Sequence, residues 1–363
     1  MSGLGLGEDP TEGRAELAGK SCILAIETSC DDTAAAVVED GRRVLSNKVF
    51  SQITTHERFG GVVPEVASRK HVETITWMIE DALKEAKIGL ADLSAVAVTQ
   101  GPGLVGSLLV GVTAAKALAC ALDVPLIGVH HIAGHIYANQ LVQELVYPLV
   151  ALVVSGGHTE LVYLEREGHF RILGQTRDDA AGEAYDKVGR AMELPFPGGP
   201  YIDRLACEAD AAVVMPRAWL EPESYDFSFS GLKSAVLNVL NQARMRGETV
   251  VYAHLARGFQ ESVVEVLVEK ALRAVKATGA KQLLLAGGVA ANQGLRGTLT
   301  ARCAADGISL VIPPLSLCMD NAAMIAVAAH LKWKHGLFTS LDMKAEPTLS
   351  LEEWSIVPRI IVR

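Results

Sequence analysis

Aromatic side chains are scarce in this sequence, at 5% of 363 residues. A surface that stacks single-stranded nucleic acid needs exposed rings, so the composition gives no sign of such a platform. Basic residues are outnumbered as well, because 33 lysines and arginines face 42 aspartates and glutamates, for a formal net charge of −9. A protein that holds RNA alone through phosphate contacts usually shows a basic balance. We therefore expect any RNA partner to need a local basic patch or a helper subunit.

The sequence also lacks the patterns of a secreted or membrane protein. None of the six cysteines forms a C-x-x-C pair, which favours reduced, buried thiols over disulfides or a thiolate zinc site. Residues 1–21 are polar and glycine-rich, without a signal-peptide core, and we expect a flexible extension. The longest apolar run, at 104–122, contains Lys116 and precedes Asp123 and Pro125, which favours a buried helix over a membrane span. We predict a cytoplasmic protein with no membrane partner.

Apolar residues, by contrast, make up half of the chain, and there are 33 glycines. This composition is typical of a well-buried α/β protein, and the length suits two lobes with separate cores. Segments 22–50 and 147–176 each read as strand, polar turn, strand, glycine turn and strand, followed by helical patterns. We predict a duplicated, two-lobed α/β protein with a ligand cleft between the lobes.

The predicted boundaries follow from these patterns. The first lobe is expected over 22–135, completed by a C-terminal helix at 320–336, the second lobe over 136–319, and a tail over 337–363. The run "HIAGHIYANQLVQEL" at 131–145 is expected to be one continuous helix.

Two of the predicted turns are candidate phosphate sites. "ETSCDDT" at 27–33 and "VSGGHT" at 154–159 each place small hydrogen-bonding residues between apolar strands. Gly156 and Gly157 allow close approach to successive backbone N–H groups, which suits an anion. Taken alone, each turn is more typical of a plain β-turn. The pair favours a functional interpretation, because a nucleotide between two lobes needs one turn from each.

Three other segments carry polar residues that suit a nucleoside. Asn292 lies in "AGGVAANQG", which is not G-x-G-x-x-G and so does not support a Rossmann site. Asp203 lies in the first turn of a helix expected to open near Pro200, where it suits either ribose hydroxyls or the helix N-terminus itself. Asp186 belongs to the acidic stretch 178–186, most of which an ordinary solvated helix face explains.

The stretch "GVHHIAGHIYAN" at 128–139 is the candidate metal site. His131 and His135 stand four positions apart, so they share one helix face. A zincin has glutamate after the first histidine, where Ile132 stands, and the inverted form has it before the second, where Gly134 stands. Such a pair alone is more often packing or chance. With Asp320 as third ligand, the set suits Fe(II), Zn or Mn.

Ten motifs, in order along the chain, together resemble a known family. They are "ETSCDDT", "FGGVVPEVASRKH", "GPGLVGSL", "HHIAGH", "VSGGHT", "DDAAGEAYDKVGR", "PGGPYID", "FSFSGLK", "AGGVAANQGLR" and "MDNAAMIA". The set looks like the bacterial TsaD family, also called Gcp or YgjD, of tRNA adenosine threonylcarbamoyltransferases. The resemblance covers residues 22–335. Met319 stands where the family commonly has threonine before the metal-binding aspartate, which leaves that ligand in place.

The resemblance implies an actin-like, sugar-kinase-like ATPase (ASKHA) fold with two related lobes. It implies that His131, His135 and Asp320 bind one metal ion, iron(II), with zinc or magnesium as alternatives. It implies threonylcarbamoyl-AMP or ATP as the nucleotide ligand. The phosphate and acyl part would lie near the metal and the second turn, at Val153, Val154, Ser155, Gly156 and Gly157. The adenosine part would be held by Asp186, Gly199, Asp203 and Asn292.

The resemblance also implies the reaction and its partners. The threonylcarbamoyl group passes to the exocyclic amine of the adenosine beside the anticodon in tRNAs that read ANN codons, and AMP leaves. Asp31 or Asp32 is the candidate acceptor of the amine proton. The implied partners are tRNA, a TsaB-like paralogue that forms a heterodimer, and a TsaE-like ATPase; no DNA is expected. The helix "ETITWMIEDAL" at 73–83 is expected to turn its apolar face to the paralogue or to the core.

Two other functions compete with this interpretation. One is an actin-like scaffold in which ATP drives assembly without group transfer. Such a switch needs only a magnesium ion and few protein ligands, so the candidate metal set of His131, His135 and Asp320 argues against it. The other is a metalloendopeptidase, which the missing glutamate beside either histidine argues against.

Overall fold

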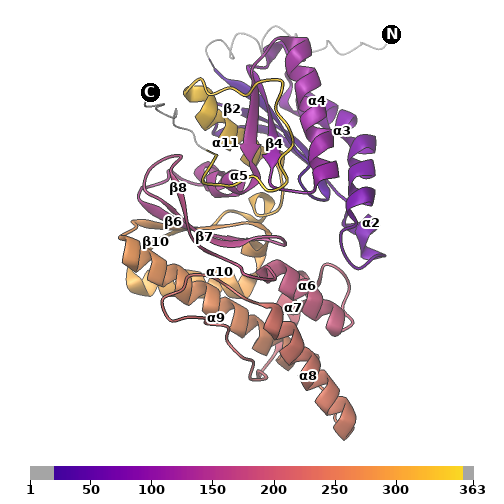
Figure 1. Ribbon diagram of the computed structural model, residues 1–363, viewed down its shortest axis with the longest axis vertical. Helices are drawn as coiled ribbons and strands as arrows, with labels where there is room; N and C mark the ends of the chain where they lie inside the picture. The colour runs from indigo at the N-terminus through magenta and orange to yellow at the C-terminus, as the bar shows by residue number, and fades with distance from the viewer. Residues whose placement is uncertain (1–19, 355–363) are drawn as a thin grey trace, which may run out of the picture.

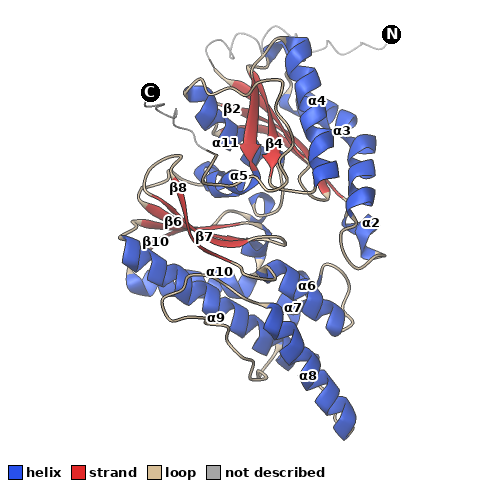
Figure 2. Cartoon of the chain, viewed as in Figure 1, coloured by secondary structure: helices blue, strands red, loops and turns tan. Residues whose placement is uncertain are grey.

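The computed structural model describes residues 20–354, so the predicted extension at 1–21 lies almost wholly outside the described residues. Two five-stranded sheets form the centre of the molecule (Figures 1 and 2). The first has the order β3-β2-β1-β4-β5 and the second the order β10-β9-β6-β7-β8. In both, an antiparallel three-strand meander is extended by two parallel strands. The repeated topology agrees with the duplication that the sequence pattern predicts.

The strands follow the apolar runs of the sequence. The first sheet consists of β1 (Cys22–Glu27), β2 (Asp32–Glu39), β3 (Arg43–Ser51), β4 (Ala95–Gly101) and β5 (Leu126–His130). The second consists of β6 (Leu149–Val154), β7 (Thr159–Leu164), β8 (Phe170–Gln175), β9 (Gln282–Ala286) and β10 (Ser309–Val311). The central strands β1 and β6 are buried at every position, because both faces of each sheet are covered.

The helices cover these faces in layers. In the first lobe they are α2 (Ile53–Glu57), α3 (Pro64–Ala86), α4 (Val105–Leu122), α5 (His131–Ala138) and α11 (Ala322–Lys334). In the second they are α6 (Ala181–Ala191), α7 (Gly198–Glu208), α8 (Ser230–Arg246), α9 (Tyr252–Thr278) and α10 (Gln293–Asp306). Helices α3 and α4 pack on the outer face of the first sheet, and α5 and α11 lie between the two sheets (Figure 1).

Helix α5 is shorter than the sequence pattern predicts. The helix expected over 131–145 ends at Ala138 and continues only as a 3₁₀ turn, Asn139–Leu141. The Asn139 amide donates to the carbonyls of His135, Ile136 and, in the second lobe, Leu285, which competes with the helix ladder.

Helix α3 turns its apolar residues inward. Ile75, Met78 and Ile79 pack against the first sheet, which confirms the alternative that this face turns to the core. Helix α4, by contrast, leaves much of its apolar surface exposed. Among the described helices it alone is long and apolar enough to cross a membrane, yet only 33% of it is buried in the protein. The expectation of a buried helix holds for the face that packs on the sheet and fails for the outer face, since α4 belongs to the outermost layer.

The described part of the C-terminal tail, 337–354, runs across β5 and reaches the second lobe. The Leu349 carbonyl lies 3.0 Å from Nε2 of His130, and the Trp354 indole donates to the carbonyl of Gly128. The Glu352 carboxylate then accepts from the amide of Ile172 in β8. The tail therefore fixes the end of β5, from which α5 begins.

Candidate metal and nucleotide site

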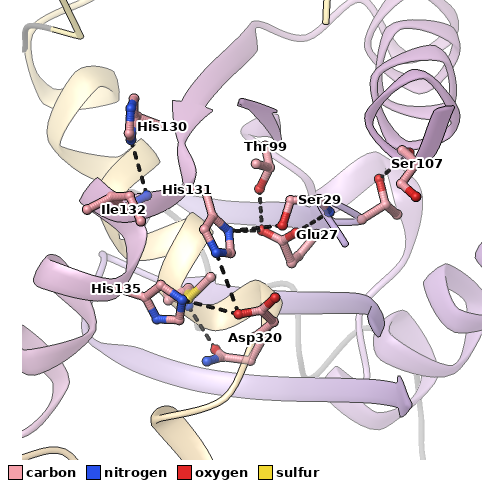
Figure 3. Close-up of polar contacts among 12 residues, drawn as sticks. Glu27, Ser29, Thr99, Ser107, His130, His131, Ile132, His135 and Asp320 are labelled. Carbon is pink, nitrogen blue, oxygen red and sulfur yellow. Dashed lines mark hydrogen bonds and ion pairs between the residues drawn. The ribbon is translucent and has the colours of Figure 1, made fainter. Parts of the chain in front are cut away.

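His131, His135 and Asp320 converge on one point between the lobes (Figure 3). Nε2 of His135 lies 3.1 Å from Oδ1 of Asp320, and Nε2 of His131 lies 3.6 Å from the same oxygen. One ligand atom from each residue lies within 4.8 Å of the others, and both histidines are buried. Two imidazoles and one carboxylate in this arrangement could hold a divalent transition metal.

Local sequence explains how these ligands meet. Strand β5 ends at His130, whose Nδ1 accepts from the amide of Ile132 and so caps α5. Gly134 lies between the two ligand histidines, and a Cβ there would stand 2.8 Å from Cδ1 of Ile325 in α11. Glycine at this position therefore lets α5 pack closely on α11. Asp320 precedes α11 by two residues, which brings its carboxylate under the histidine pair.

Glu27 orients His131 from the opposite side, and the sequence analysis did not identify this role. One oxygen of this buried carboxylate lies 3.0 Å from Nδ1 of His131 and accepts from the hydroxyl of Thr99, while the other accepts from the amide of Ser29. Because Nδ1 is engaged, Nε2 is left to face the ligand point. The signal was available, since Glu27 opens the "ETSCDDT" motif.

The buried charges of His131, Asp320 and Glu27 shift one another's pKa values. Burial disfavours the imidazolium of His131, but Asp320 and Glu27 outweigh it and raise its pKa to about 9. Burial by itself would raise the pKa of Asp320, and the neighbouring histidines, His131 first, lower it. The site therefore strongly favours a positive charge among its carboxylates, which a proton or a metal ion supplies.

Replacing Glu27 with glutamine is expected to weaken metal binding by about 10- to 100-fold, as the loss of an orienting carboxylate typically does. The amide retains the size of the side chain but removes the charge that holds His131. Titration of the metal-free protein with Zn²⁺ against a competing chelator measures the affinity. Glu39→Gln, at a buried carboxylate remote from the site, is the matched control. Equal affinities for Glu27→Gln and the wild type would contradict the assigned role.

Asp31 and Asp32, in the turn at 27–33, have different surroundings. Asp32 begins β2 and is buried, and its Oδ1 has no hydrogen-bond partner. Burial, together with the charges of Asp320 and Asp31, raises its pKa to about 8. The pKa of Asp31 is also raised by burial, and the thiol of Cys30 partly offsets this. Of the two candidate bases, Asp32 has the unpaired oxygen.

The second turn leaves space beside its glycines. Val153 and Val154 end the buried strand β6, and the Ser155 hydroxyl accepts from the amide of His158. A Cβ on Gly156 or Gly157 would meet nothing within 4 Å, so the backbone here faces open space. The turn can therefore admit a ligand.

His158, in the same turn, was not among the predicted site residues. Burial, followed by the charges of His131 and His135, lowers its pKa to about 4, so it is a neutral imidazole beside the metal ligands. The only sequence signal for it was its place in "VSGGHT".

The four predicted nucleoside residues lie in the second lobe and form two groups. Asp203 accepts from the amides of Gln293 and Gly294, and Asn292 caps α10 by accepting from the amide of Leu295. The side chain of Gln260 joins Asp203 to Asn292, a link that the sequence did not reveal.

Asp186 forms the second group, next to Gly198 and Gly199. Its carboxylate accepts from the amide of Gly198 at 2.7 Å, and its pKa is raised by burial, which the amides of Gly198 and Gly199 partly offset. The charges of Arg190 and Asp31 also act on it. Since Arg190 in turn donates to the carbonyl of Gly60 in the first lobe, this group lies where the two lobes meet.

Comparisons with known proteins match most of the chain. The model of the family TsaD, tRNA N6-adenosine threonylcarbamoyltransferase, matches residues 43–327. The chain is similar to proteins of that name from Halalkalibacterium halodurans, at 61% identity over 92% of this chain and 97% of the relative, and from Bacillus cereus, at 61% over 91% and 96%.

Two solved structures share the fold at low identity. Full-length HypF in a phosphate- and nucleotide-bound form has a TM-score of 0.59 at 14% identity, covering 88% of this chain and 47% of that one. Component A of (R)-2-hydroxyglutaryl-CoA dehydratase from Acidaminococcus fermentans has a TM-score of 0.51 at 14% identity, covering 86% and 98%. These likenesses confirm the two-lobed ASKHA fold expected from the sequence.

Proposed function

This chain belongs to the TsaD family and is a tRNA N6-adenosine threonylcarbamoyltransferase, and from that premise we propose how its residues carry out the transfer. The donor is threonylcarbamoyl-AMP, and the acceptor is the exocyclic amine of the adenosine beside the anticodon in tRNAs that read ANN codons. The grouping of His131, His135 and Asp320 beside both turns carries the proposal. The scaffold and peptidase alternatives are set aside, because the family transfers a group to tRNA.

The three ligands would hold iron(II), since two imidazoles and one carboxylate are a common Fe(II) set, with zinc or magnesium as alternatives. The donor set and the burial of the histidines fit such an ion. When bound, the ion would supply a Lewis acid for an oxygen of the donor. Metal analysis of protein purified without added metal identifies the native ion.

The other residues bind the donor and move one proton. The backbone at Gly156 and Gly157 receives the phosphate, and Asp186, Gly199, Asp203 and Asn292 hold the adenosine. The acceptor amine attacks the carbamoyl carbon, the new C–N bond forms, and the C–O bond to phosphate breaks, so that AMP leaves with the bonding electrons. Asp32 takes the amine proton, because its unpaired carboxylate oxygen and pKa of about 8 suit a base near neutral pH.

A transfer assay tests this function. Purified protein, partner subunits, unmodified tRNA and labelled threonylcarbamoyl-AMP are combined, and label in the tRNA is counted. We expect label in tRNA and release of one AMP per transfer. Release of AMP without labelled tRNA would contradict the proposed acceptor.

We also propose that the protein works in the cytoplasm, in a complex with a TsaB-like paralogue and a TsaE-like ATPase. The outer face of α4 is the proposed contact with the paralogue. Its exposed residues are apolar or small, and five of them recur every four positions: Val105, Leu109, Thr113, Ala117 and Ala121. An apolar stripe of this kind, uncovered within the chain, suits packing against a helix of a partner.

Leu109→Glu is expected to weaken the heterodimer by at least about 100-fold, because it places a charge at the centre of the apolar stripe. Leu109 is 51% exposed, so the change leaves the fold intact. Leu341→Glu, at a leucine 48% exposed elsewhere, is the matched control. Sedimentation of the mixed subunits measures the association. A heterodimer unaffected by Leu109→Glu would place the paralogue on another face.

A further inference from the structure

Helix α8 projects from the second lobe, and its free end lies away from the rest of the molecule (Figures 1 and 2). It has 17 residues, so it is about 25 Å long. Only Leu232, Val236 and Ala243 are buried. Most of its length therefore faces solvent and is available to a partner.

The charge of α8 is unlike that of the rest of the chain. Residues 230–247 contain Lys233, Arg244 and Arg246 and no aspartate or glutamate, although the whole chain carries a net charge of −9. All three side chains are exposed, and none forms an ion pair with any residue between 20 and 354. Elsewhere in the same lobe, the partly exposed cations Arg217, Arg257 and Arg302 each pair with a glutamate.

The carboxylates flanking α8 form no ion pair with its three cations within residues 20–354. Asp178, just before α6, accepts from the hydroxyls of Ser228 and Ser230 and from the amides of Phe229 and Ser230, so it caps the start of the helix. Glu248 lies beyond Gly247, past the end of the helix. The three cations thus form a positive row along the length of the helix, with Lys233 and Arg244 on one face and Arg246, two positions further on, on another.

The position of α8 relates this row to the reaction. The start of α8 is hydrogen-bonded to Asp178, in the segment that leads into α6. Helix α6 in turn carries Asp186 of the nucleoside group. Lys233 lies near this end, and Arg244 lies eleven residues further on, about 17 Å away. A tRNA whose target adenosine enters the site, while its double-stranded stem stays outside, would lie alongside this row of cations.

We infer that α8 is a docking surface for the tRNA, and that Lys233, Arg244 and Arg246 contact phosphates of its anticodon arm. RNA presents closely spaced negative charges, and cations that lack a partner in the protein are free to neutralise them. Such contacts position the RNA without reading its sequence. The row also supplies the local basic patch that an acidic protein needs for RNA.

The test measures tRNA binding at several salt concentrations, without donor, using the full chain with and without the paralogue. The triple variant Lys233→Gln/Arg244→Gln/Arg246→Gln is expected to bind tRNA about tenfold or more weakly near 0.1 M salt. Its plot of log affinity against log salt is expected to be shallower by about 2 to 3, roughly one for each lost phosphate contact.

Two matched variants separate local contact from net charge and from misfolding. Arg42→Gln/Lys281→Gln/Lys344→Gln removes three exposed cations far from α8 and is expected to keep the wild-type slope. Lys233→Arg/Arg244→Lys/Arg246→Lys keeps the charges and is expected to bind normally. Equal slopes for the wild type and the α8 Gln variant, or equal losses in both Gln variants, would overturn the inference.

The result of the α8 test can be told apart from a failure of the proposed transfer reaction. Metal content and binding of the donor are expected to remain unchanged in the α8 variants, since none of the three residues belongs to that site. Loss of assembly with a protein partner, with tRNA binding intact, would also overturn the inference, because α8 would then serve that protein.

Discussion

Asp320→Asn is expected to abolish stoichiometric metal binding and to lower the transfer rate by roughly two to three powers of ten. The carboxylate is the only anionic ligand of the proposed set, and its Oδ1 lies between Nε2 of His131 and Nε2 of His135. An amide oxygen retains the shape but loses the charge that offsets the ion. Metal-assisted stabilisation of a transition state is worth several kcal/mol, which corresponds to this loss of rate.

The measurement combines metal analysis of the purified protein with the transfer assay. Asp306→Asn is the matched control, because that aspartate lies on the surface, where it pairs with Lys276. It is expected to keep both metal and activity. Full metal content in Asp320→Asn would exclude this carboxylate as a ligand, whereas loss of metal with unchanged rate would show that the ion does not assist the transfer.

Asp32→Asn is expected to lower the rate of transfer by about 100- to 10,000-fold, the usual contribution of a general base, while leaving metal content unchanged. The unpaired Oδ1 of Asp32 points to this role, and a pKa of about 8 makes it dependent on pH. Because only the ionised carboxylate accepts a proton, the wild-type rate should rise as the pH increases towards about 8 and level off above it.

The rate measured across pH at saturating tRNA and donor distinguishes a base from a structural role. Asp32→Asn should lose the rising limb, and Asp32→Glu should restore part of the rate with a shifted limb. Asp31→Asn serves as the neighbouring control and should keep the limb, moved to lower pH because the charge of Asp31 helps to raise the pKa of Asp32. A limb that persists in Asp32→Asn would assign the proton transfer to another group.

Much of the fold was predictable because it depends on local patterns. The apolar runs that form β1 and β6 are recognisable without the structure, since strands covered on both faces have no polar alternation. The pair His131 and His135 was predictable as well, because helical spacing alone puts both on one face. The length of α5 was not, because the contact that ends the helix, from Asn139 to Leu285, crosses between lobes.

The sequence by itself determined the duplicated α/β pattern, the paired turns and the ordered motifs that mark the family. The tertiary structure decided which residues act together, because such contacts join positions far apart in the chain. Asp320 is 185 positions from His135, and Glu27 is 104 positions from His131. The same holds for surfaces. Whether an apolar residue of α3 or α4 faces the core or a partner, and whether a cation of α8 has a carboxylate beside it, depends on packing between elements rather than on local spacing.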